Sequence, residues 1–541
     1  MTIRPNPLTI PVVEVSKLGE KEAIYRALAA TLGVGSEGIL GYNIVKKSLD
    51  ARRKANIVHH YQLDVEVDRE DLLLKKRSDL KVSPVAKKAT IFDGIKMGQK
   101  LRHKPLIIGS GPAGSFCALT LNTLGVPCTI MERGEAIGPR TRTVNKLRRN
   151  GTFDPESHYC YGEGGAGTFS DGKLTCGRNH PLIRHVFETF VKHGAPKDIL
   201  YESHPHMGTD YLLRIAYNMR KSLEKSGSEY HFKEKMVSFR DGKKEAKYLV
   251  KFASGLEIPT DHLILAIGHS ARDTYQSLLD HGVAIAQKPF AIGARLEHPQ
   301  EDINKIQLGS CQLLGAAEYK LRSQQKGRGI WTFCMCPGGH LLPTSAKEGH
   351  LAINGMSYHA RKSHFANAAV VVNIRREDFD NGHPLDGMRF QENLEKEAFK
   401  AGGGGYHSPA QRLTDFLKGR LSKGHMNTTY KPGVQPARMD KLLPDYVVES
   451  LKAAMGDYQN KMRGYISDRA LVVGLESKTS SPIVMPRDKN LQSVSHKNLF
   501  PCGEGAGHAG GIISAALDGV KVGRALLASM ELKEEKSLLN S

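Results

Sequence analysis

The segment from residue 106 to residue 132 constrains the fold more than any other part of the sequence. A short apolar strand is predicted over 106–108. It is followed by the turn GSGPAG at 109–114, a helix over 115–124 and a second strand that ends in Glu132. A strand, a glycine turn, a helix, a strand and an acid in this order are typical of the dinucleotide-binding half of a Rossmann fold. Strands and helices also alternate elsewhere, so the chain is predicted to be an α/β protein.

Each position of this turn has a predicted role in binding a dinucleotide. Gly109 permits the tight turn, Gly111 lets the backbone approach a diphosphate, and Gly114 lets the helix pack on the strand. The helix N-terminus offers free N–H groups and the positive end of the helix dipole to the diphosphate. Pro112 and Ala113, within the turn, are also predicted to contact the cofactor.

The residues that follow offer further contacts for a nucleotide. Glu132 is placed to accept hydrogen bonds from ribose hydroxyls, and its charge argues against the 2′-phosphate of NADP at this site. Arg133 and Arg140 can meet the adenine or the phosphates, or they can be solvated charges. In the glycine-rich loop downstream, Gly165 and Gly167 would allow close backbone approach to a cofactor; an ordinary surface loop is the alternative.

A second glycine-rich helix start lies far downstream. A strand predicted at 498–502 leads into GEGAGHAGGI at 503–512, where another helix begins. Such a turn can hold the extended remainder of FAD, with the helix N-terminus directed at the flavin N1–C2=O edge. His508 is the candidate catalytic residue, because its ordinary pKa is near neutral; a positioning hydrogen bond is the alternative. The cofactor contacts predicted here are Gly503, Glu504 (to a ribityl hydroxyl), Gly510, Gly511, Ile512 and, after the strand between the two turns, Gly268.

These pieces resemble the glutathione-reductase-type FAD superfamily, in which a glycine fingerprint, an Ala-Thr-Gly-like turn and a Gly-Asp-like turn follow in this order. Here the middle turn reads Ala266-Ile267-Gly268, and Glu504 stands where Asp is usual. A closer resemblance covers nearly the whole chain. It is similar to the family of predicted FAD-dependent dehydrogenases, or NAD(P)/FAD-dependent oxidoreductases, with a small N-terminal α+β domain and a dedicated C-terminal domain. The matching phrases are KSLDARRK (47–54), YGEGGAGTFSDGKL (161–174), CPGG (336–339), NGMS (354–357) and ESKTSSP (476–482).

The resemblance implies an FAD enzyme that transfers a hydride through flavin N5 to or from an unidentified small molecule. In this superfamily, the loop at 161–174 often passes near the flavin. No second dinucleotide motif is found in a strand–turn–helix context, so NADH or NADPH, as an electron donor, would dock in the substrate cleft. Residues 479–482 can line that cleft, and Lys173, His340 and Arg295 are weaker candidates.

The cysteines argue against two other classes of protein. Cys160 and Cys176 are too far apart for the redox dithiol of a flavin disulfide reductase, and no CxxC pair or histidine cluster suggests a metal. A disulfide between Cys334 and Cys336 would close a very short, strained ring. This pair is interpreted either as simple packing or as a labile redox pair or reactive thiol. Eight cysteines in 541 residues fit a reduced, cytoplasmic compartment.

Four segments are predicted within the 541 residues. They are a small basic α+β domain at 1–98, the first part of the FAD-binding domain at 99–290, an inserted substrate or cap domain at 291–465, and the closing part of the FAD-binding domain at 466–541. Strands are predicted at 8–15, 42–45 and 57–67, and a helix at 21–32. The match GVGSEG at 33–38 follows a helix instead of a strand, so it is predicted to be a helix stop and a loop.

The charge keeps other functions open. Lys and Arg number 77 against 56 Asp and Glu, a net charge of +21. The N-terminal segment holds more than its share, with Arg52, Arg53 and Lys54 the first residues to test. An FAD-containing RNA-binding or tRNA-modifying flavoprotein is therefore an alternative. An FAD-dependent monooxygenase and a sensor with a structural FAD are others. No long apolar stretch predicts a membrane span or a secretory signal, and the sequence leaves the oligomeric state open.

Overall fold

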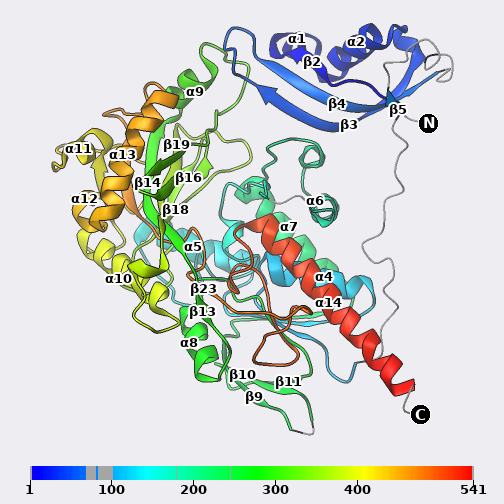
Figure 1. Cartoon of the computed structure of the whole chain (residues 1–541), viewed down its shortest axis with the longest axis vertical. Helices are drawn as coiled ribbons and strands as arrows, with labels where there is room; N and C mark the ends of the chain where they lie inside the picture. The colour runs from blue at the N-terminus through cyan, green and yellow to red at the C-terminus, as the bar shows by residue number, and fades with distance from the viewer. Residues whose placement is uncertain are drawn as a thin grey trace.

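The computed structural model describes residues 3–68, 73, 81–82, 101–177, 180–243 and 245–538 (Figure 1). The boundary expected between residues 98 and 99 lies outside these ranges. The described chain forms an N-terminal module, a nucleotide-binding part with a parallel sheet, and a second part built on a large, mostly antiparallel sheet.

The nucleotide-binding part is built on five parallel strands in the order β24-β12-β6-β7-β8. Ile107, Ile264 and Phe500 point toward α4 and α14, whereas the strand neighbours of these residues pack toward another sheet. Both faces are therefore buried, as parallel sheets require. The bounds are β6 (Leu106–Ile108), β7 (Thr129–Glu132), β8 (Glu229–Phe232), β12 (Leu263–Leu265), β24 (Leu499–Pro501), α4 (Pro112–Thr123) and α14 (Ile512–Leu538).

Helices α4 and α14 lie against each other although the sequence separates them widely (Figure 1). A Cβ at Gly519 would lie 2.1 Å from the Ala113 carbonyl oxygen, so only glycine permits this approach. The other face is covered by the sheet β9 (Met236–Asp241), β10 (Tyr248–Phe252) and β11 (Glu257–Thr260). Further helices of this part are α5 (Ile137–Asn150), α6 (Leu182–Lys192), α7 (Gly208–Lys225) and α8 (Arg272–Asp280).

The second part contains seven strands in the order β15-β16-β19-β14-β22-β20-β21. Because β22 pairs with β14 and β20, this sheet continues past the boundary that the sequence placed at 465. The strands are β14 (Phe290–Pro299), β15 (Arg322–Gln325), β16 (Arg328–Cys336), β19 (Phe365–Ile374), β20 (Ser408–Arg412), β21 (Val434–Pro436) and β22 (Leu471–Glu476). The helices are α9 (Gln300–Leu308), α10 (Asp386–Ala401), α11 (Leu413–Lys418), α12 (Met439–Leu442) and α13 (Asp445–Lys461). Two short antiparallel pairs are formed by β13 (Ala286–Gln287) with β23 (Ile483–Val484) and by β17 (His340–Pro343) with β18 (Ile353–Met356).

The N-terminal module is a small α+β unit with its own core. Its helix α2 ends at Gly33, which has φ +68°, so GVGSEG is a helix stop as predicted. The strand expected at 8–15 ends at Pro11 because the chain turns into a helix there. The bounds are β1 (Ile3–Arg4), β2 (Leu8–Pro11), α1 (Val12–Leu18), α2 (Glu20–Leu32), β3 (Ile39–Asp50), β4 (Val58–Val67) and β5 (Lys81–Val82).

Strand β3 fastens this module to the nucleotide-binding part. The Lys47 N–H donates to the Tyr201 carbonyl at 2.8 Å, and the Ser203 N–H donates to the Lys47 carbonyl at 2.8 Å. The Lys47 ammonium also lies 2.8 Å from Glu20 and 3.1 Å from Glu202. One lysine therefore joins a carboxylate of its own module to a carboxylate of the neighbouring part.

Candidate functional site

A cavity of about 2320 Å³ lies where the three parts meet. Its wall includes both glycine-rich turns, the end of β16 and, at the N-terminal module, Leu49 and Arg52. Typical small-molecule sites measure about 300–1,000 Å³. The cavity is therefore large enough for a dinucleotide and a second molecule.

The first glycine turn lines this cavity as predicted. A Cβ at Gly109 would lie 2.3 Å from the Ala266 carbonyl oxygen, so the turn needs glycine to pass the end of β12. Gly111 differs, because a Cβ there would meet no atom closer than Cα of Gly165, at 3.7 Å. Packing alone does not require glycine at 111. Pro112 then begins α4, whose first-turn N–H groups have no partner within the helix.

The closing glycine loop follows β24 at the same edge of the parallel sheet and lines the same cavity. A Cβ at Gly510 would meet nothing within 4 Å, which again leaves room that the protein does not fill. Glu504 lines the cavity, with a carboxylate oxygen 3.4 Å from Nδ1 of His269. The Gly503 N–H donates to Asp518 at 2.7 Å, and Asp518 also pairs with Arg487. This carboxylate fixes the start of the loop.

The loop predicted to approach a cofactor joins the two turns. A Cβ at Gly165 would lie 2.9 Å from Cα of Gly111, and one at Gly167 would lie 3.0 Å from Ile512. The predicted cofactor residues that line the cavity are Gly109, Gly111, Pro112, Ala113, Glu132, Arg133, Gly165, Gly167, Gly268, Glu504, Gly510, Gly511 and Ile512. Gly114 and Gly503 lie behind this wall, where a Cβ would strike the Gly109 carbonyl and the Ala113 side chain, respectively.

The Glu132 carboxylate already accepts more hydrogen bonds from the protein than its predicted role suggests. One oxygen accepts from the N–H and the hydroxyl of Ser110, at 3.0 and 2.8 Å. The other accepts from the N–H groups of Gly134 and Gly162, at 3.0 and 2.9 Å. All four lone-pair positions are taken. A ribose hydroxyl would therefore have to displace one donor, and the rotatable Ser110 hydroxyl is the one that can turn away.

The two arginines after Glu132 are held by the protein itself. Arg133 lines the cavity, but its guanidinium stacks 3.9 Å from the Tyr161 ring centroid and pairs with Glu156 and Asp273. Arg140 is fully buried and donates to four carbonyls of residues 158–163. Burial lowers the pKa of Arg140 to about 10. The interpretation of Arg140 as a ligand for the nucleotide is wrong, because this residue braces the loop instead.

His508 lines the cavity through a ring that is already hydrogen-bonded. Its Nε2–H donates to the Met485 carbonyl at 3.0 Å. Burial, and then the charge of Arg487, lower its pKa below the usual range. The geometry supplies the positioning bond that was the alternative interpretation, and a proton-transfer role stays a prediction.

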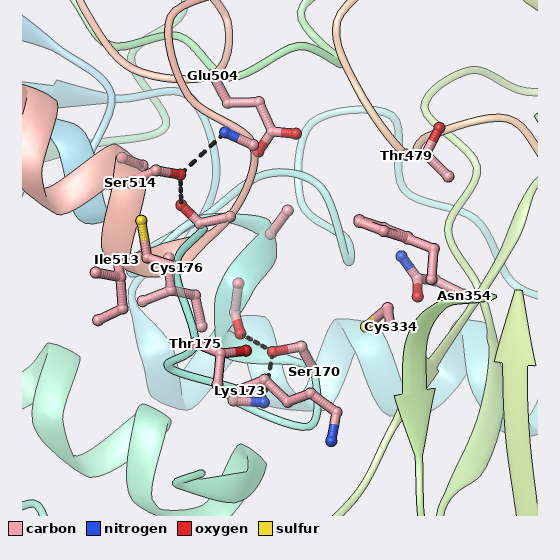
Figure 2. A pocket seen from close by; sticks show the side chains of 18 of the residues that line it. Ser170, Lys173, Thr175, Cys176, Cys334, Asn354, Thr479, Glu504, Ile513 and Ser514 are labelled. Carbon is pink, nitrogen blue, oxygen red and sulfur yellow. Dashed lines mark hydrogen bonds between the residues drawn. The ribbon is translucent and has the colours of Figure 1, made fainter. Parts of the chain in front are cut away.

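The wall opposite the start of α14 contains residues that the sequence pointed to weakly or not at all. Figure 2 shows Cys334, Asn354 and Thr479 across the cavity from Ile513 and Ser514. Thr479 was expected from its phrase. Asn354 and Cys334 also lie in or beside quoted phrases, which is the signal that could have found them.

Of the three weaker candidates, one lines the cavity and two do not. Lys173 lines the cavity and pairs with Asp171 and Glu318, at 3.2 and 2.6 Å. His340 and Arg295 do not line it, and Arg295 is fully buried.

A lysine missed by sequence reasoning also faces the cavity. Lys478 is 7% exposed, and its ammonium lies 3.4 Å from Sγ of Cys160 and 3.3 Å from the Ser270 hydroxyl. No carboxylate of the described residues contacts this ammonium, and a buried cation of this kind stabilises negative charge that develops nearby. Within the described ranges, no three His, Cys, Asp or Glu side chains gather as a metal site would require. No described helix is both long and apolar enough to cross a membrane.

Comparisons with known proteins identify the class. Residues 289–479 match the model of the FAD-dependent protein, C-terminal domain-like family, residues 107–166 match the NAD(P)-binding Rossmann-like domain, and residues 5–66 match a domain of unknown function (DUF8436). An uncharacterized protein of Clostridium beijerinckii is 40% identical over 542 residues, which cover 98% of this chain and 100% of the relative. The chain belongs to the family of that protein, a family of FAD-dependent, oxidoreductase-type enzymes with a Rossmann-like domain. The predicted family resemblance and fold class are confirmed.

Solved structures are more distant. PqsL of P. aeruginosa in complex with 2-aminobenzoylacetate is 12% identical, with a TM-score of 0.37 over 80% of this chain and 88% of that one. The flavin-dependent halogenase CmlS is 13% identical, with a TM-score of 0.35 over 80% of this chain and 58% of that one. At this similarity the comparison bears on neither reaction nor substrate.

Proposed function

We propose that this protein binds FAD along the two glycine turns and transfers a hydride between the flavin and a small molecule. The observation that carries the proposal is the pair Gly111 and Gly510. Both line one cavity, and at both the protein leaves room for a side chain that the sequence does not use. A closely approaching ligand explains glycine at such positions.

The residues present fit an FAD molecule. The first turn of α4 offers N–H groups to a diphosphate, and the start of α14 offers the positive end of a helix dipole. Glu504 supplies a carboxylate that can accept from a polyol, and the buried Lys478 supplies positive charge on the cavity wall. A bound flavin accepts or donates a hydride at its N5 atom. The protein's own groups bind the cofactor, orient it and stabilise its negative charge.

The electron donor we propose is NADH or NADPH, docked in the same cavity. The volume of about 2320 Å³ supports room for a second molecule beside FAD. The most direct test is rapid mixing of the flavin-loaded protein with each nucleotide under anaerobic conditions. Loss of flavin absorbance at a rate that saturates with one nucleotide is the expected result. A flavin that neither nucleotide reduces, but a small alcohol or amine does, would leave a dehydrogenase without a nicotinamide donor.

The cofactor site is tested by a change that the protein itself tolerates. Gly111→Ala places a methyl group where it would clash with the bound cofactor but not with the protein. FAD binding should therefore weaken at least about tenfold, a cost of about 1.4 kcal/mol. Gly456→Ala on the exposed side of α13 is the matched control, since a Cβ there meets nothing within 4 Å. Equal flavin content in both variants would contradict the proposed binding path.

Hydroxylation and RNA modification are the alternatives that the sequence left open. Stoichiometric O2 consumption with a hydroxylated product would replace our proposal by a monooxygenase. RNA affinity that falls steeply with salt would support the nucleic-acid alternative. Of the charges proposed for it, Arg52 is already paired, since its guanidinium lies 2.5 Å from Asp50.

A further inference from the structure

Three of the sequence phrases outside the two glycine turns meet around one buried arginine. Arg295 of β14 lies 3.1 Å from Glu476 and 2.5 Å from the Asn354 amide oxygen. It also donates to Asn367 at 2.6 Å and to the Cys334 carbonyl at 3.0 Å. Glu476 begins ESKTSSP, Asn354 begins NGMS, and CPGG begins two residues after Cys334. The phrases therefore build one polar support beneath the end of β16.

What this support holds against the cavity is a pair of cysteines. Phe333 pairs with Ala369 and Cys336 pairs with Asn367, so two residues of β16 oppose one residue of β19 in a bulge. Cys334, inside the bulge, has φ +43° and lines the cavity. Cys336 is fully buried, and its thiol donates to the Cys334 carbonyl at 3.3 Å. A bulge re-aims side chains, and here the side chains of Cys334 and Cys336 contact each other.

The neighbouring residues leave space for Cys336 and place a positive charge near both sulfurs. A Cβ at Gly355 would lie 3.0 Å from Sγ of Cys336, so glycine at 355 keeps the space of that sulfur free. Sγ of Cys336 lies 4.0 Å from a guanidinium nitrogen of Arg295. The neighbouring Cys336 thiol, and then the Arg295 charge, lower the pKa of Cys334 to about 7 although burial opposes this. The thiolate form of Cys334 is therefore accessible near neutral pH, and thiolate is the reactive form.

The opposite side of the cavity belongs to the closing glycine loop and the start of α14. Figure 2 shows Cys334 facing this side across open space. Cys334 and the predicted flavin contacts therefore line one cavity, with Cys336 buried directly behind Cys334.

We propose that Cys334 and Cys336 form a second two-electron redox centre that exchanges electrons with the flavin; this rests on the proposed function. Closing the Sγ–Sγ bond breaks two S–H bonds and releases two protons and two electrons, all of which oxidised FAD takes up to become reduced FAD. The reverse step opens the disulfide and returns both thiols. Because a disulfide between residues i and i+2 closes a short, strained ring, it is easily reduced, as a catalytic disulfide must be.

The first experiment measures the thiols without reference to the flavin. The protein is equilibrated with glutathione buffers of graded redox poise, quenched with acid and alkylated. Trypsin then releases residues 329–347, which contain both cysteines of the pair and no other. We expect both thiols to be lost together along a two-electron curve, with the peptide two hydrogens lighter and unalkylated. Alkylation of both cysteines at every poise overturns the proposal.

The second experiment counts electrons in the flavin-loaded protein. Under anaerobic dithionite titration, the wild type should take up two electrons more per flavin than Cys336→Ser. Since a buried hydroxyl can disturb folding, Cys336→Ala is titrated in parallel. Cys311→Ser, at a half-buried cysteine outside the cavity wall, should keep the wild-type count.

The two proposals fail differently. A bound, reducible flavin with equal electron counts in the wild type and both Cys336 variants overturns the redox pair and leaves the proposed function standing. A protein that binds no flavin contradicts the proposed function, and the electron exchange with it.

Discussion

At the scale of single residues, the interior of this protein depends on buried ion pairs. Arg295 and Glu476 are both fully buried and 3.1 Å apart, and Arg272 pairs with the fully buried Glu395 at 2.7 Å. Burial raises the pKa of Glu476, and Arg295 opposes that rise. Removing one partner from such a pair leaves an uncompensated charge, which is far more costly than losing an exposed pair.

We therefore expect Arg295→Leu to lower the free energy of unfolding by about 3–5 kcal/mol. The double variant Arg295→Leu/Glu476→Leu should be less destabilised than the single one, because it leaves no buried charge unpaired. Urea unfolding followed by fluorescence measures both. Lys400→Leu, which breaks an exposed pair with Glu397, should cost less than about 1 kcal/mol. Equal losses for Arg295→Leu and Lys400→Leu would contradict the argument.

His508 allows a sharper distinction between proton transfer and positioning. If its function is the hydrogen bond to Met485, His508→Asn, which keeps a side-chain N–H, should preserve the rate of flavin reduction within a few-fold at every pH. If the ring transfers a proton, the rate should fall about 10²–10⁴-fold and one limb of the pH profile should disappear. The existing hydrogen bond from Nε2 to the Met485 carbonyl favours the first outcome.

At the scale of elements, the described strands show which parts of the fold a sequence can predict. β6, α4 and β7 follow from a local pattern in which glycine spacing fixes the order of strand, turn and helix. The pairing of β22 with β14 does not, because it joins residues far apart whose register depends on the whole sheet. The boundary expected at 465 failed to include β22 for this reason.

The candidate site divides in the same way. The residues of both glycine turns could be predicted, since their chemistry lies in consecutive positions. Asn354 reaches the cavity only because β18 packs against the seven-stranded sheet, and Thr479 only because it follows β22 of that sheet. The four partners of Glu132 could not be predicted either, because Gly162 comes from a separate loop. Arg140 was considered as a nucleotide contact because of its charge. Its burial depends on main-chain carbonyls, whose positions cannot be predicted from a sequence pattern.

Strand β14 carries a histidine that should make stability depend on pH. His298 is buried, donates to the Tyr465 carbonyl at 2.9 Å, and has its pKa lowered to about 4 by burial. The unfolded chain, with a pKa near 6.5, binds the proton first as the pH falls. Stability is therefore complete above about pH 6.5 and is lost toward pH 4, by up to about 3 kcal/mol from this group.

The variant His298→Gln should weaken this dependence. The difference in apparent melting temperature between pH 7 and pH 4.5 should be smaller than in the wild type. His281→Gln, at an exposed histidine after α8, is the control and should retain the wild-type difference. A wild-type difference in His298→Gln would show that other groups carry the acid sensitivity.

At the scale of the whole molecule, the N-terminal module forms part of the cavity rim. Leu49 and Arg52 line the cavity, and Lys47 holds the strand that carries them against Glu202. Lys47→Glu would place three carboxylates together and loosen this attachment. We expect unchanged flavin absorbance, a higher KM for the second substrate and faster proteolytic removal of the N-terminal module.

Lys46→Glu is the matched control for this change, since Lys46 is the exposed neighbour on the same strand. It should leave KM and proteolysis near the wild-type values. If both variants behave alike, net charge and not the attachment of the module determines the effect.

The strand order of the nucleotide sheet also has a consequence during biosynthesis. β6 and β7 leave the ribosome early, but β6 must wait for β12, and α4 must wait for α14 to cover its apolar face. The whole seven-stranded sheet is translated in between. The nascent chain therefore carries an exposed apolar helix for most of its synthesis, a state that attracts chaperones. Loading with cofactor can begin only after α14 has emerged.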